Sequence, residues 1–359
     1  MPYQSTELEI SNLLSLMMER GASDIHLIAG KPPTLRIDSE LVELKDYEVL
    51  SGNAIASLVE VLLETDERKK VFRAEKELDF SFAFKDNIRL RVNAYHQKSY
   101  PAAALRLITN KIKTIDELNL PEQIKNLVNY KQGLVLLVGP TGHGKSTTLA
   151  ALIDLINQTM AKNIVTIEDP IEYVYIQNKS LINQREVGSD TNSFGKALRS
   201  VLREDADVVL VGEMRDLESI ATTITIAETG HLVFATLHTN NAAQTIDRII
   251  DVFPAYQQNQ IRSQLANILV SVVSQRLLPL VGGGRIPAVE ILMMNTAVAN
   301  VIRENKSYEL TNIIHTAAAS GMISLDSDLA RLVRNNSVKI EDALLQVSDP
   351  EAFEGLLRR

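Results

Sequence analysis

The chain has 359 residues, of which 45% are hydrophobic and 23% charged, and its formal net charge is −8. This composition indicates an ordinary globular protein long enough for two or three domains, and the acidic balance argues against nucleic-acid binding. The lack of cysteine excludes disulfides and thiolate metal sites, no apolar run approaches the roughly 18 residues that span a bilayer, and the opening MPYQSTELEI lacks the features of a secretory signal.

The first hundred residues predict a domain of mixed helices and strands. Apolar residues recur at helical spacing, which predicts an amphipathic helix with a buried face formed by Ile10, Leu13, Leu14 and Met17. Residues 23–38 contain short apolar runs broken by GKPP (30–33), a pattern typical of two strands and a tight turn. Residues 50–72 predict a second helix.

A period-two alternation follows. One face carries Phe80, Phe82 and Phe84, and then Ile88, Leu90, Val92 and Ala94, while the opposite face carries Arg89, Arg91 and Asn93. Such a meander completes an α+β domain over residues 1–108. The polar segment TNKIKTIDELN (109–119) is predicted to be a linker.

After residue 119, apolar runs alternate with helical patterns. Near-continuous runs are typical of strands buried on both faces in a parallel sheet covered by helices. These runs are LVLLV (134–138), NIVTI (163–167), DVVLV (207–211) and HLVFATL (231–237). The expected fold class is therefore α/β over residues 120–289, followed by a helical C-terminal region over 290–359 with one break at Ser320-Gly321.

The segment GPTGHGKST (139–147) holds the complete pattern G-x-x-x-x-G-K-[ST] between a predicted strand and a predicted helix. Glycines let successive N–H groups turn toward one phosphate, and the helix N-terminus adds the positive end of its dipole. In such a loop Lys145 reaches the β- and γ-phosphates and Ser146 ligates Mg²⁺. The alternative is a glycine-rich turn that only caps a helix. The predicted nucleotide-binding residues are Pro140, Thr141, Gly142, His143, Gly144, Lys145, Ser146 and Thr147.

His143 is a bulky, titratable residue inside this loop. Two interpretations follow from the sequence. Either the side chain points away from the phosphates while its backbone N–H still donates, or it senses pH or a neighbouring group, because an unperturbed histidine has a pKa of about 6.5.

Acidic residues follow two of the predicted strands. Glu213 comes just after DVVLV, where ligands lie in parallel sheets, so it is a candidate to orient Mg²⁺-bound water or to polarise the attacking water. Glu168, Asp169 and Glu172 follow NIVTI, where the alternative is a charged turn in which Pro170 ends the strand.

Two histidines flank the run LVFATL. His231 and His238 are seven residues apart, and an odd spacing places them on opposite faces of an unbroken strand. Only one of them is then expected to face the site, and His238, at the carboxyl end, is the better candidate to sense a γ-phosphate.

Five motifs in this order resemble one protein family. They are GPTGHGKST, IVTIEDPIEY, DVVLVGEMRD, GHLVFATLHT with DRIIDVFP, and SQRLLP. The chain resembles the secretion-ATPase superfamily of RecA-like hexamers, and within it the retraction ATPases of type IV pili. ASDIHL and RLRVNAYHQ resemble that family's PAS-like N-terminal domain. The resemblance implies a RecA-like P-loop core preceded by this domain and followed by a small helical region.

The resemblance also implies residue roles. Glu213 corresponds to the catalytic Walker B glutamate, which shares Mg²⁺ with Ser146, and Glu168 is implied near the metal and water. His231 and His238 match the family's histidine box. Arginines of the N-terminal domain are implied to reach the nucleotide of the next subunit, and a solvated strand face is the alternative; the candidates are Arg89, Arg91 and Arg106.

The C-terminal segment AVANVIRENK (297–306) resembles the family signature AIRNLIREGK but departs from it at two positions. Ala299 stands where arginine is usual, and Asn305 stands where glycine is usual. If this segment couples hydrolysis to movement, Ala299 removes a donor and a charge, so force coupling is expected to differ while ATPase activity survives.

The implied function is that of a cytoplasmic homohexamer at the inner face of the cytoplasmic membrane, which hydrolyses ATP with Mg²⁺ to retract type IV pili. Its implied partners are an inner-membrane platform protein and an accessory retraction ATPase, and no nucleic acid is expected. The alternatives are the accessory paralogue itself, a RecA-like nucleic-acid motor, or a nucleotide-locked scaffold with a broken site. A pilus-extension or type II secretion ATPase is disfavoured by the compact N-terminal domain and the absence of cysteine.

Overall fold

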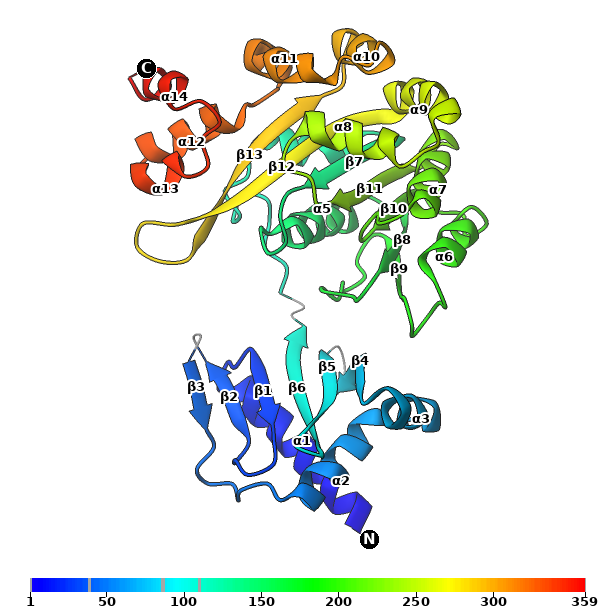
Figure 1. The fold of residues 1–359 in the computed structure, drawn as a ribbon, viewed down its shortest axis with the longest axis vertical. Helices are drawn as coiled ribbons and strands as arrows, with labels where there is room; N and C mark the ends of the chain where they lie inside the picture. Colours follow the sequence, from blue (N-terminus) through cyan, green and yellow to red (C-terminus); the bar gives the residue numbers. More distant parts are fainter. Residues whose placement is uncertain (1, 38–39, 85–87, 109–110, 359) are drawn as a thin grey trace. The chain divides into compact units, whose positions relative to one another are not determined.

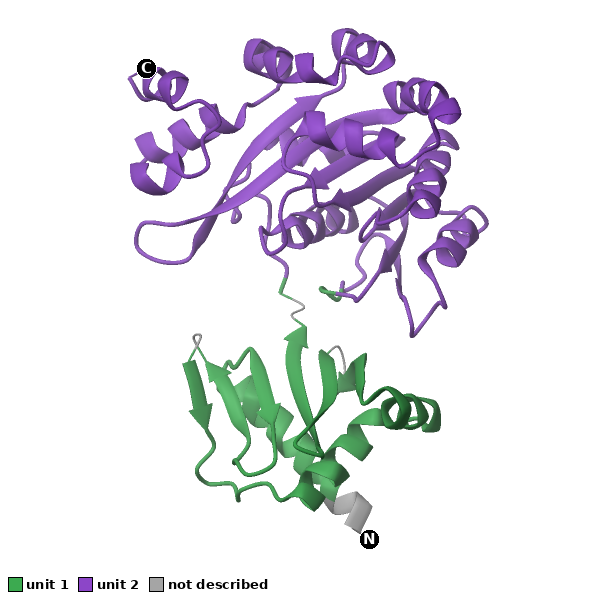
Figure 2. Cartoon of the chain, viewed as in Figure 1, with its two compact units in different colours: residues 1–111, 172–174 green, residues 112–171, 175–359 purple. Residues whose placement is uncertain are grey.

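The computed structural model describes residues 2–37, 40–84, 88–108 and 111–358. The chain divides into two compact units, residues 1–111 with 172–174, and residues 112–171 with 175–359 (Figure 2). The first two residues of the predicted linker, 109 and 110, lie outside the described residues. The finer division at residues 119 and 289 stays a prediction.

The first unit is an antiparallel sheet with three helices (Figure 1). The strand order is β3-β2-β1-β6-β5-β4, and each strand is antiparallel to its neighbours. The strands are β1 (Asp24–Leu27), β2 (Thr34–Ile37), β3 (Glu40–Glu43), β4 (Glu77–Phe84), β5 (Ile88–Gln97) and β6 (Tyr100–Ile108). The helices are α1 (Pro2–Glu19), α2 (Gly52–Leu63) and α3 (Asp66–Glu75). The α+β domain expected from the alternating pattern is confirmed.

The prediction of one helix over residues 50–72 was wrong. Glu64 adopts a left-handed φ of 56°, which ends α2. The side chain of Thr65 then accepts a hydrogen bond from the Arg68 N–H at 3.2 Å and caps the start of α3. Both helices contribute apolar residues to one core, so helical periodicity continued across the break.

The core of the first unit lies on one face of its sheet. Phe80, Phe82 and Leu90 are buried there together with Met17 and Leu58 from the helices. The opposite face of β5 and β6 carries the polar side chains that alternate with them. The sheet therefore separates the core from the face that carries Arg89, Arg91 and Arg106.

The second unit is built on a seven-stranded sheet in the order β13-β12-β7-β11-β10-β8-β9. Neighbouring strands are parallel except for β12 and β13, which are antiparallel. The strands are β7 (Gly133–Val138), β8 (Asn163–Glu168), β9 (Leu181–Glu186), β10 (Val208–Val211), β11 (Leu232–Leu237), β12 (Leu269–Pro279) and β13 (Arg285–Met293). The predicted strands correspond to β7, β8, β10 and β11, whereas β9, β12 and β13 were not predicted.

Helices surround this sheet (Figure 1). Apolar residues of α6 to α10 share one core with the side chains on one face of the strands, and α5 packs against β7. The helices are α4 (Glu122–Lys125), α5 (Lys145–Thr159), α6 (Phe194–Val201), α7 (Leu217–Glu228), α8 (Ala242–Asp251), α9 (Ala255–Ile268) and α10 (Thr296–Arg303), with a 3-10 turn η1 (Asn126–Asn129) after α4.

The C-terminal region is helical, but it is broken more often than predicted. It comprises α11 (Leu310–Thr316), α12 (Leu325–Arg334), α13 (Ile340–Leu344) and α14 (Pro350–Leu357), with 3-10 turns η2 (Ser307–Glu309) and η3 (Ala318–Ser320). Leu329 and Phe353 pack with Leu278 and Ile286 from β12 and β13, so the strand pair extends beyond the sheet into a second core. Within the described residues, no helix combines the length and apolar character needed to cross a bilayer.

Candidate nucleotide site

The glycine-rich loop joins the carboxyl end of β7 to α5. Gly144 adopts a φ of 81° immediately before the 15-residue helix α5, a conformation that side-chain-bearing residues rarely adopt. A Cβ on Gly139 would lie 2.4 Å from the carbonyl oxygen of Gln275, so only glycine allows the loop to pass this close to β12. The loop therefore presents backbone N–H groups at a helix N-terminus, the arrangement that binds phosphate.

Lys145 is held inside this loop. Its side chain is buried, and Nζ donates to the carbonyl oxygens of Gly139 at 2.7 Å and Pro140 at 3.0 Å. An ammonium group fixed beside inward-facing N–H groups fits a nucleotide phosphate, and the Ser146 hydroxyl on the next residue is an oxygen ligand of the kind that Mg²⁺ prefers.

A chain of polar contacts runs from Lys145 across the carboxyl ends of three neighbouring strands. His238 follows β11, and its Nδ1 lies 3.5 Å from Lys145 Nζ and 3.3 Å from Thr141 Oγ1. Its Nε2 lies 3.1 Å from Oε1 of Glu213, which follows β10. Lysine has no acceptor, so Nδ1 accepts and the Nε2–H donates to Glu213. His238 thus connects the loop to the carboxylate.

Arg215 extends this chain to β8. Its Nε donates to Glu213 Oε2 at 2.9 Å, and Nη1 donates to Asp169 Oδ2 at 3.4 Å. Both oxygens of Glu213 are thereby held in place. Arg215 was not among the residues predicted from the sequence, although its position two residues after Glu213 places both residues beside the same strand end.

Glu168 ends β8 with its side chain buried. Oε1 accepts hydrogen bonds from Thr166 Oγ1 at 2.6 Å and from Gln184 Nε2 at 3.3 Å. The structure thus places Glu168 at the same edge of the sheet as Glu213.

His231 is placed differently. It precedes β11, at the opposite end of that strand from His238. Nδ1 lies 2.9 Å from the carbonyl oxygen of Ile226, and the His231 carbonyl accepts from the Gly133 N–H at 3.0 Å. Within this chain the structure does not bring His231 to the loop, and any catalytic role for it stays a prediction.

The three predicted arginines belong to the first unit. Arg91 on β5 lies directly opposite Arg106 on β6, and Arg89 is two residues along β5, so all three project from one face. Arg106 Nε donates to Asp24 Oδ1 at 2.7 Å, and Arg91 Nε lies 4.0 Å from Asp79 Oδ1. Burial raises the pKa of Asp24, but hydrogen bonds from Ser23 and Arg106 outweigh burial and hold this pKa below its usual value.

His143 contacts β12. Its Nδ1 accepts a hydrogen bond from the Leu277 N–H at 3.1 Å, and its carbonyl accepts one from Gln275 Nε2 at 2.8 Å. Burial lowers the pKa of His143, and the charges of Arg276, Lys145 and Arg285 lower it further. The imidazole is therefore neutral at neutral pH and serves as an acceptor for the neighbouring strand.

The two departures in the C-terminal signature have separate structural settings. Asn305 follows α10 with a φ of 58°, a left-handed conformation that asparagine tolerates better than most residues, and its Oδ1 accepts from Arg262 Nε at 3.1 Å. Ala299 on α10 is buried in the core of the second unit. Asparagine thus replaces glycine where glycine-like backbone is needed, whereas alanine at 299 adds apolar contact.

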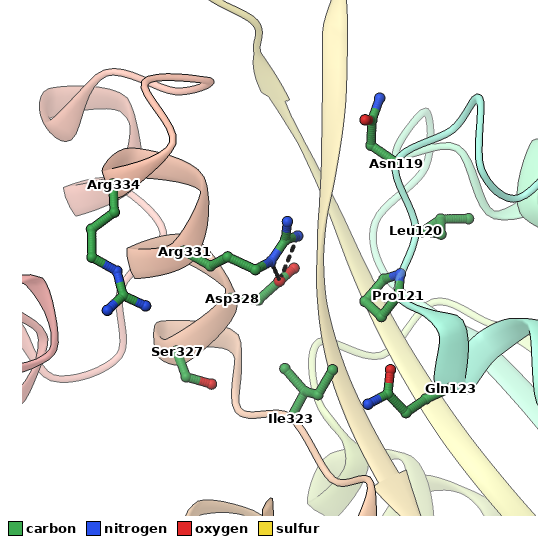
Figure 3. A pocket seen from close by; sticks show the side chains of 9 residues that line it. All are labelled: Asn119, Leu120, Pro121, Gln123, Ile323, Ser327, Asp328, Arg331 and Arg334. Carbon is green, nitrogen blue, oxygen red and sulfur yellow. Dashed lines mark hydrogen bonds and ion pairs between the residues drawn. The ribbon is translucent and has the colours of Figure 1, made fainter. Parts of the chain in front are cut away.

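A separate pocket of about 420 Å³ lies between α12 and residues 119–123 (Figure 3). Arg331 points into it and is paired with Asp328 at 2.7 Å, and Asp328 also accepts from the Val289 N–H. No residue of the glycine-rich loop lines this pocket, so the pocket is separate from the candidate nucleotide site.

Comparison with known proteins identifies the family of the chain. Residues 4–284 match the family described as type II/IV secretion system protein. The chain is 45% identical over 346 residues to the type IV pilus retraction ATPase PilT of Pseudomonas aeruginosa, covering 96% of this chain and 100% of that protein. It is 37% identical to the type IV pilus ATPase PilU of the same organism, over 94% of this chain and 88% of that protein. A crystal structure of the pilus retraction motor PilT with bound ADP superposes with a TM-score of 0.90 at 45% identity, covering 96% of this chain and 99% of that one.

Proposed function

The chain belongs to the family of type II/IV secretion system proteins and is an ATPase of its pilus-retraction branch, and we propose that it retracts type IV pili as a hexameric motor. The observation that carries the proposal is the contact chain Lys145–His238–Glu213 at the carboxyl ends of β7, β11 and β10. This chain joins a phosphate-binding loop to a carboxylate that can act on water.

In this proposal the loop binds the triphosphate of ATP. Backbone N–H groups and Lys145 neutralise the phosphate charge, and Ser146 and Glu213 are the residues that would hold Mg²⁺. Magnesium supplies Lewis-acid stabilisation of charge on the phosphate oxygens. Mg²⁺ usually takes one or two protein oxygens together with substrate phosphates and water, which this pair of residues suits.

Glu213 orients and polarises the attacking water. His238 and Arg215 each hold one of its oxygens, so the carboxylate is fixed in orientation before substrate arrives. Nδ1 of His238 contacts Lys145. If Lys145 moves when phosphate binds, the His238 side chain transmits that movement to Glu213. Glu168, buried beside them, adds negative charge near the metal and water.

The arginine face of the first unit completes the site in the assembled ring. Arg89, Arg91 and Arg106 reach the nucleotide bound to a neighbouring subunit in this proposal. The support is their common face and the exposure of Arg91 and Arg106, with 46% and 68% of their side chains accessible. An arginine supplied in trans stabilises charge that develops in the phosphoryl-transfer transition state.

The mechanical partner is proposed to be a platform protein in the inner membrane, which places the ring at the cytoplasmic face of that membrane. The support is the resemblance to PilT over nearly the full length of both chains. An accessory retraction ATPase is a further proposed partner.

The proposal is tested by steady-state ATPase measurements on the purified full chain, together with particle imaging. The parent is expected to form hexamers and hydrolyse ATP, and Lys145→Ala and Glu213→Gln are expected to abolish turnover. A monomer without ATPase activity would contradict the proposed motor. Strong stimulation of turnover by nucleic acid would instead favour a nucleic-acid motor.

The accessory role is the second candidate, because the chain is also 37% identical to PilU. Expression in a strain that lacks its own retraction ATPase separates the two functions. Restored pilus retraction and surface motility would support the primary motor. Restoration only in the presence of a second retraction ATPase would assign the accessory role.

A further inference from the structure

β12 contacts the nucleotide site through both of its faces. Ser274 and Arg276 lie on one face, and Gln275 and Leu277 lie on the other, because side chains alternate along a strand. These residues are buried or half-buried although three of them are polar. Buried polar groups need partners, and here the partners belong to the two loops that form the site.

The Gln275 face holds the glycine-rich loop and α5. Its amide spans two elements, since Oε1 accepts from Thr148 Oγ1 at 2.8 Å while Nε2 donates to the His143 carbonyl at 2.8 Å. The backbone N–H of Leu277 donates to the ring of His143 at 3.1 Å. Two hydrogen bonds therefore tie the loop to β12 and a third ties α5 to it, and Gly139 allows the close backbone approach.

The opposite face holds the segment that follows His238. Ser274 Oγ donates to the Asn240 carbonyl at 2.8 Å, and Arg276 Nη2 donates to the same carbonyl at 2.8 Å. Asn240 is two residues after His238, so β12 fixes both the loop that carries Lys145 and the segment that carries His238.

We propose that Gln275 is a positioning residue for nucleotide binding, which sets the conformation of the phosphate loop by bridging the His143 carbonyl and the Thr148 hydroxyl. Gln275 does not touch the reacting atoms and acts through the loop. The inference rests on the proposed nucleotide site and deepens it. It also connects that site to the β12–β13 strand pair and, through this pair, to the core around Leu329 and Phe353.

A residue that preorganises the loop contributes alike to ground-state and transition-state binding. Loss of such uniform binding raises KM and the dissociation constant with little change in kcat. Leucine at 275 preserves side-chain volume but leaves the half-buried His143 carbonyl and the buried Thr148 hydroxyl without that partner. We therefore expect Gln275→Leu to weaken binding of a fluorescent ADP analogue by about tenfold or more, where tenfold corresponds to about 1.4 kcal/mol.

The experiment measures analogue affinity, kcat, KM and thermal unfolding for the full chain. Ser271→Ala is the matched control. Ser271 is buried in the same strand and donates to the Leu292 carbonyl at 2.9 Å, away from the loop. Its loss is expected to lower stability but leave nucleotide affinity within twofold. Equal effects of the two variants on affinity would overturn the proposal.

Thr148→Val provides a second test and keeps the proposal testable if Gln275→Leu does not fold. It removes the hydroxyl that Gln275 accepts from and is expected to weaken analogue binding in the same direction. In the double variant the two losses should be less than additive, because they break one bridge. Full additivity, or unchanged affinity in Thr148→Val, would count against the bridge.

Parent ATPase activity decides the proposed function separately. If the parent hydrolyses ATP and Lys145→Ala does not, while Gln275→Leu binds like the parent, the positioning role fails and the motor stands. If the parent neither binds nor hydrolyses nucleotide, the proposed motor function is rejected, and the proposed role of Gln275 is rejected with it.

Discussion

The two units carry their functional charges in contrasting settings. In the second unit Lys145 is 7% exposed, and its neighbours His238 and Glu213 contact one another within one chain. In the first unit the side chains of Arg91 and Arg106 are 46% and 68% exposed and each has a single acidic partner. The first arrangement is a preorganised site, and the second is a charged surface.

The difference in exposure shows which charged side chains can exchange their ion-pair partners at a small cost in free energy. Exposed ion pairs contribute only about 0–1 kcal/mol, so Arg91 can leave Asp79, whose side chain is also exposed, at little cost. Arg106 instead donates to Asp24, which is buried, so its departure would leave a buried carboxylate without that partner. A buried ammonium or carboxylate that loses its partner pays a much larger desolvation cost. We infer that contacts within one chain fix the side chains of the loop site. The arginines of the first unit instead depend for their role on the groups that they contact in a neighbouring subunit.

The strongest test of this comparison is Glu213→Gln. The amide keeps the size of the side chain but removes the charge that polarises water. Loss of general-base assistance typically costs about 10²–10⁴ in rate, so kcat is expected to fall by that order while nucleotide affinity changes little. Turnover and analogue binding measure the two effects. Glu354→Gln, an exposed acid of the same unit, is the control and should behave as the parent. A kcat within tenfold of the parent would remove Glu213 from the chemistry.

The arginine face is tested by changing Arg89, Arg91 and Arg106 singly to glutamine. A side chain that stabilises transition-state charge is expected to cost about 10²–10³ in kcat when removed. Arg91→Gln changes an exposed side chain and should leave the unfolding free energy within about 0.5 kcal/mol of the parent. Arg106→Gln also removes the hydrogen bond to the buried Asp24 carboxylate and should lower the unfolding free energy more.

Mixed rings show whether such an arginine acts in trans. A low-activity arginine variant is mixed and reassembled with Glu213→Gln, and ATPase activity is measured. Some interfaces then combine an intact Glu213 with an intact arginine, so activity should exceed that of either variant alone. Additive, unrestored activity would place the arginine in its own subunit's site or on a merely solvated face.

Substitution of Asn305 tests how far the stability of the second unit depends on one left-handed backbone conformation. Its φ of 58° is left-handed, and a non-glycine residue pays roughly 1–2 kcal/mol there. Asn305→Ala also loses the hydrogen bond from Arg262, so chemical denaturation should show a loss of about 1–2 kcal/mol. Asn305→Gly should lose less than Asn305→Ala, and the reverse order would contradict this account.

The smallest expected effect concerns pH. The folded-state pKa of His143 is lowered by burial and by Arg276, Lys145 and Arg285. The hydrogen bond from Leu277 is therefore fully present above about pH 6.5, the unperturbed value, and is lost as pH falls through the lower folded pKa. One neutral hydrogen bond contributes about 0.5–1.5 kcal/mol.

We expect nucleotide affinity of the parent to fall several-fold more than that of His143→Ser as pH is lowered from neutral to mildly acidic. Binding of the fluorescent ADP analogue across this range measures the effect. Matching profiles would leave His143 as a spacer whose ring does not affect the loop.

The sequence predicted those parts of the fold whose signals are local. Apolar runs such as DVVLV and the glycine pattern at 139–147 predicted parallel strands and a phosphate loop. The odd spacing of His231 and His238 predicted opposite faces of one strand, whereas the structure separates them by placing them at opposite ends of β11. The break between α2 and α3 was missed, because apolar residues on both sides of Thr65 keep a helical spacing.

β12 shows why the rest could not be predicted. The segment LVSVVSQRLLP mixes apolar residues with Ser274, Gln275 and Arg276 and follows neither alternation nor a continuous apolar run. Its polar residues are buried because their partners lie in loops more than thirty or a hundred residues away in the chain. Three adjacent polar residues in an otherwise apolar stretch were the available signal, but they do not identify those partners.

The turn between β12 and β13 has a practical consequence for engineering this chain. Gly282, Gly283 and Gly284 all have positive φ, and added side-chain atoms there would meet open space. Exposed turns tolerate insertions well, whereas one extra residue within 274–277 would exchange the two faces of β12. A peptide tag or fluorescent reporter should therefore be placed at 282–284, where it would leave β12 in register and lie outside the residues of the candidate nucleotide site.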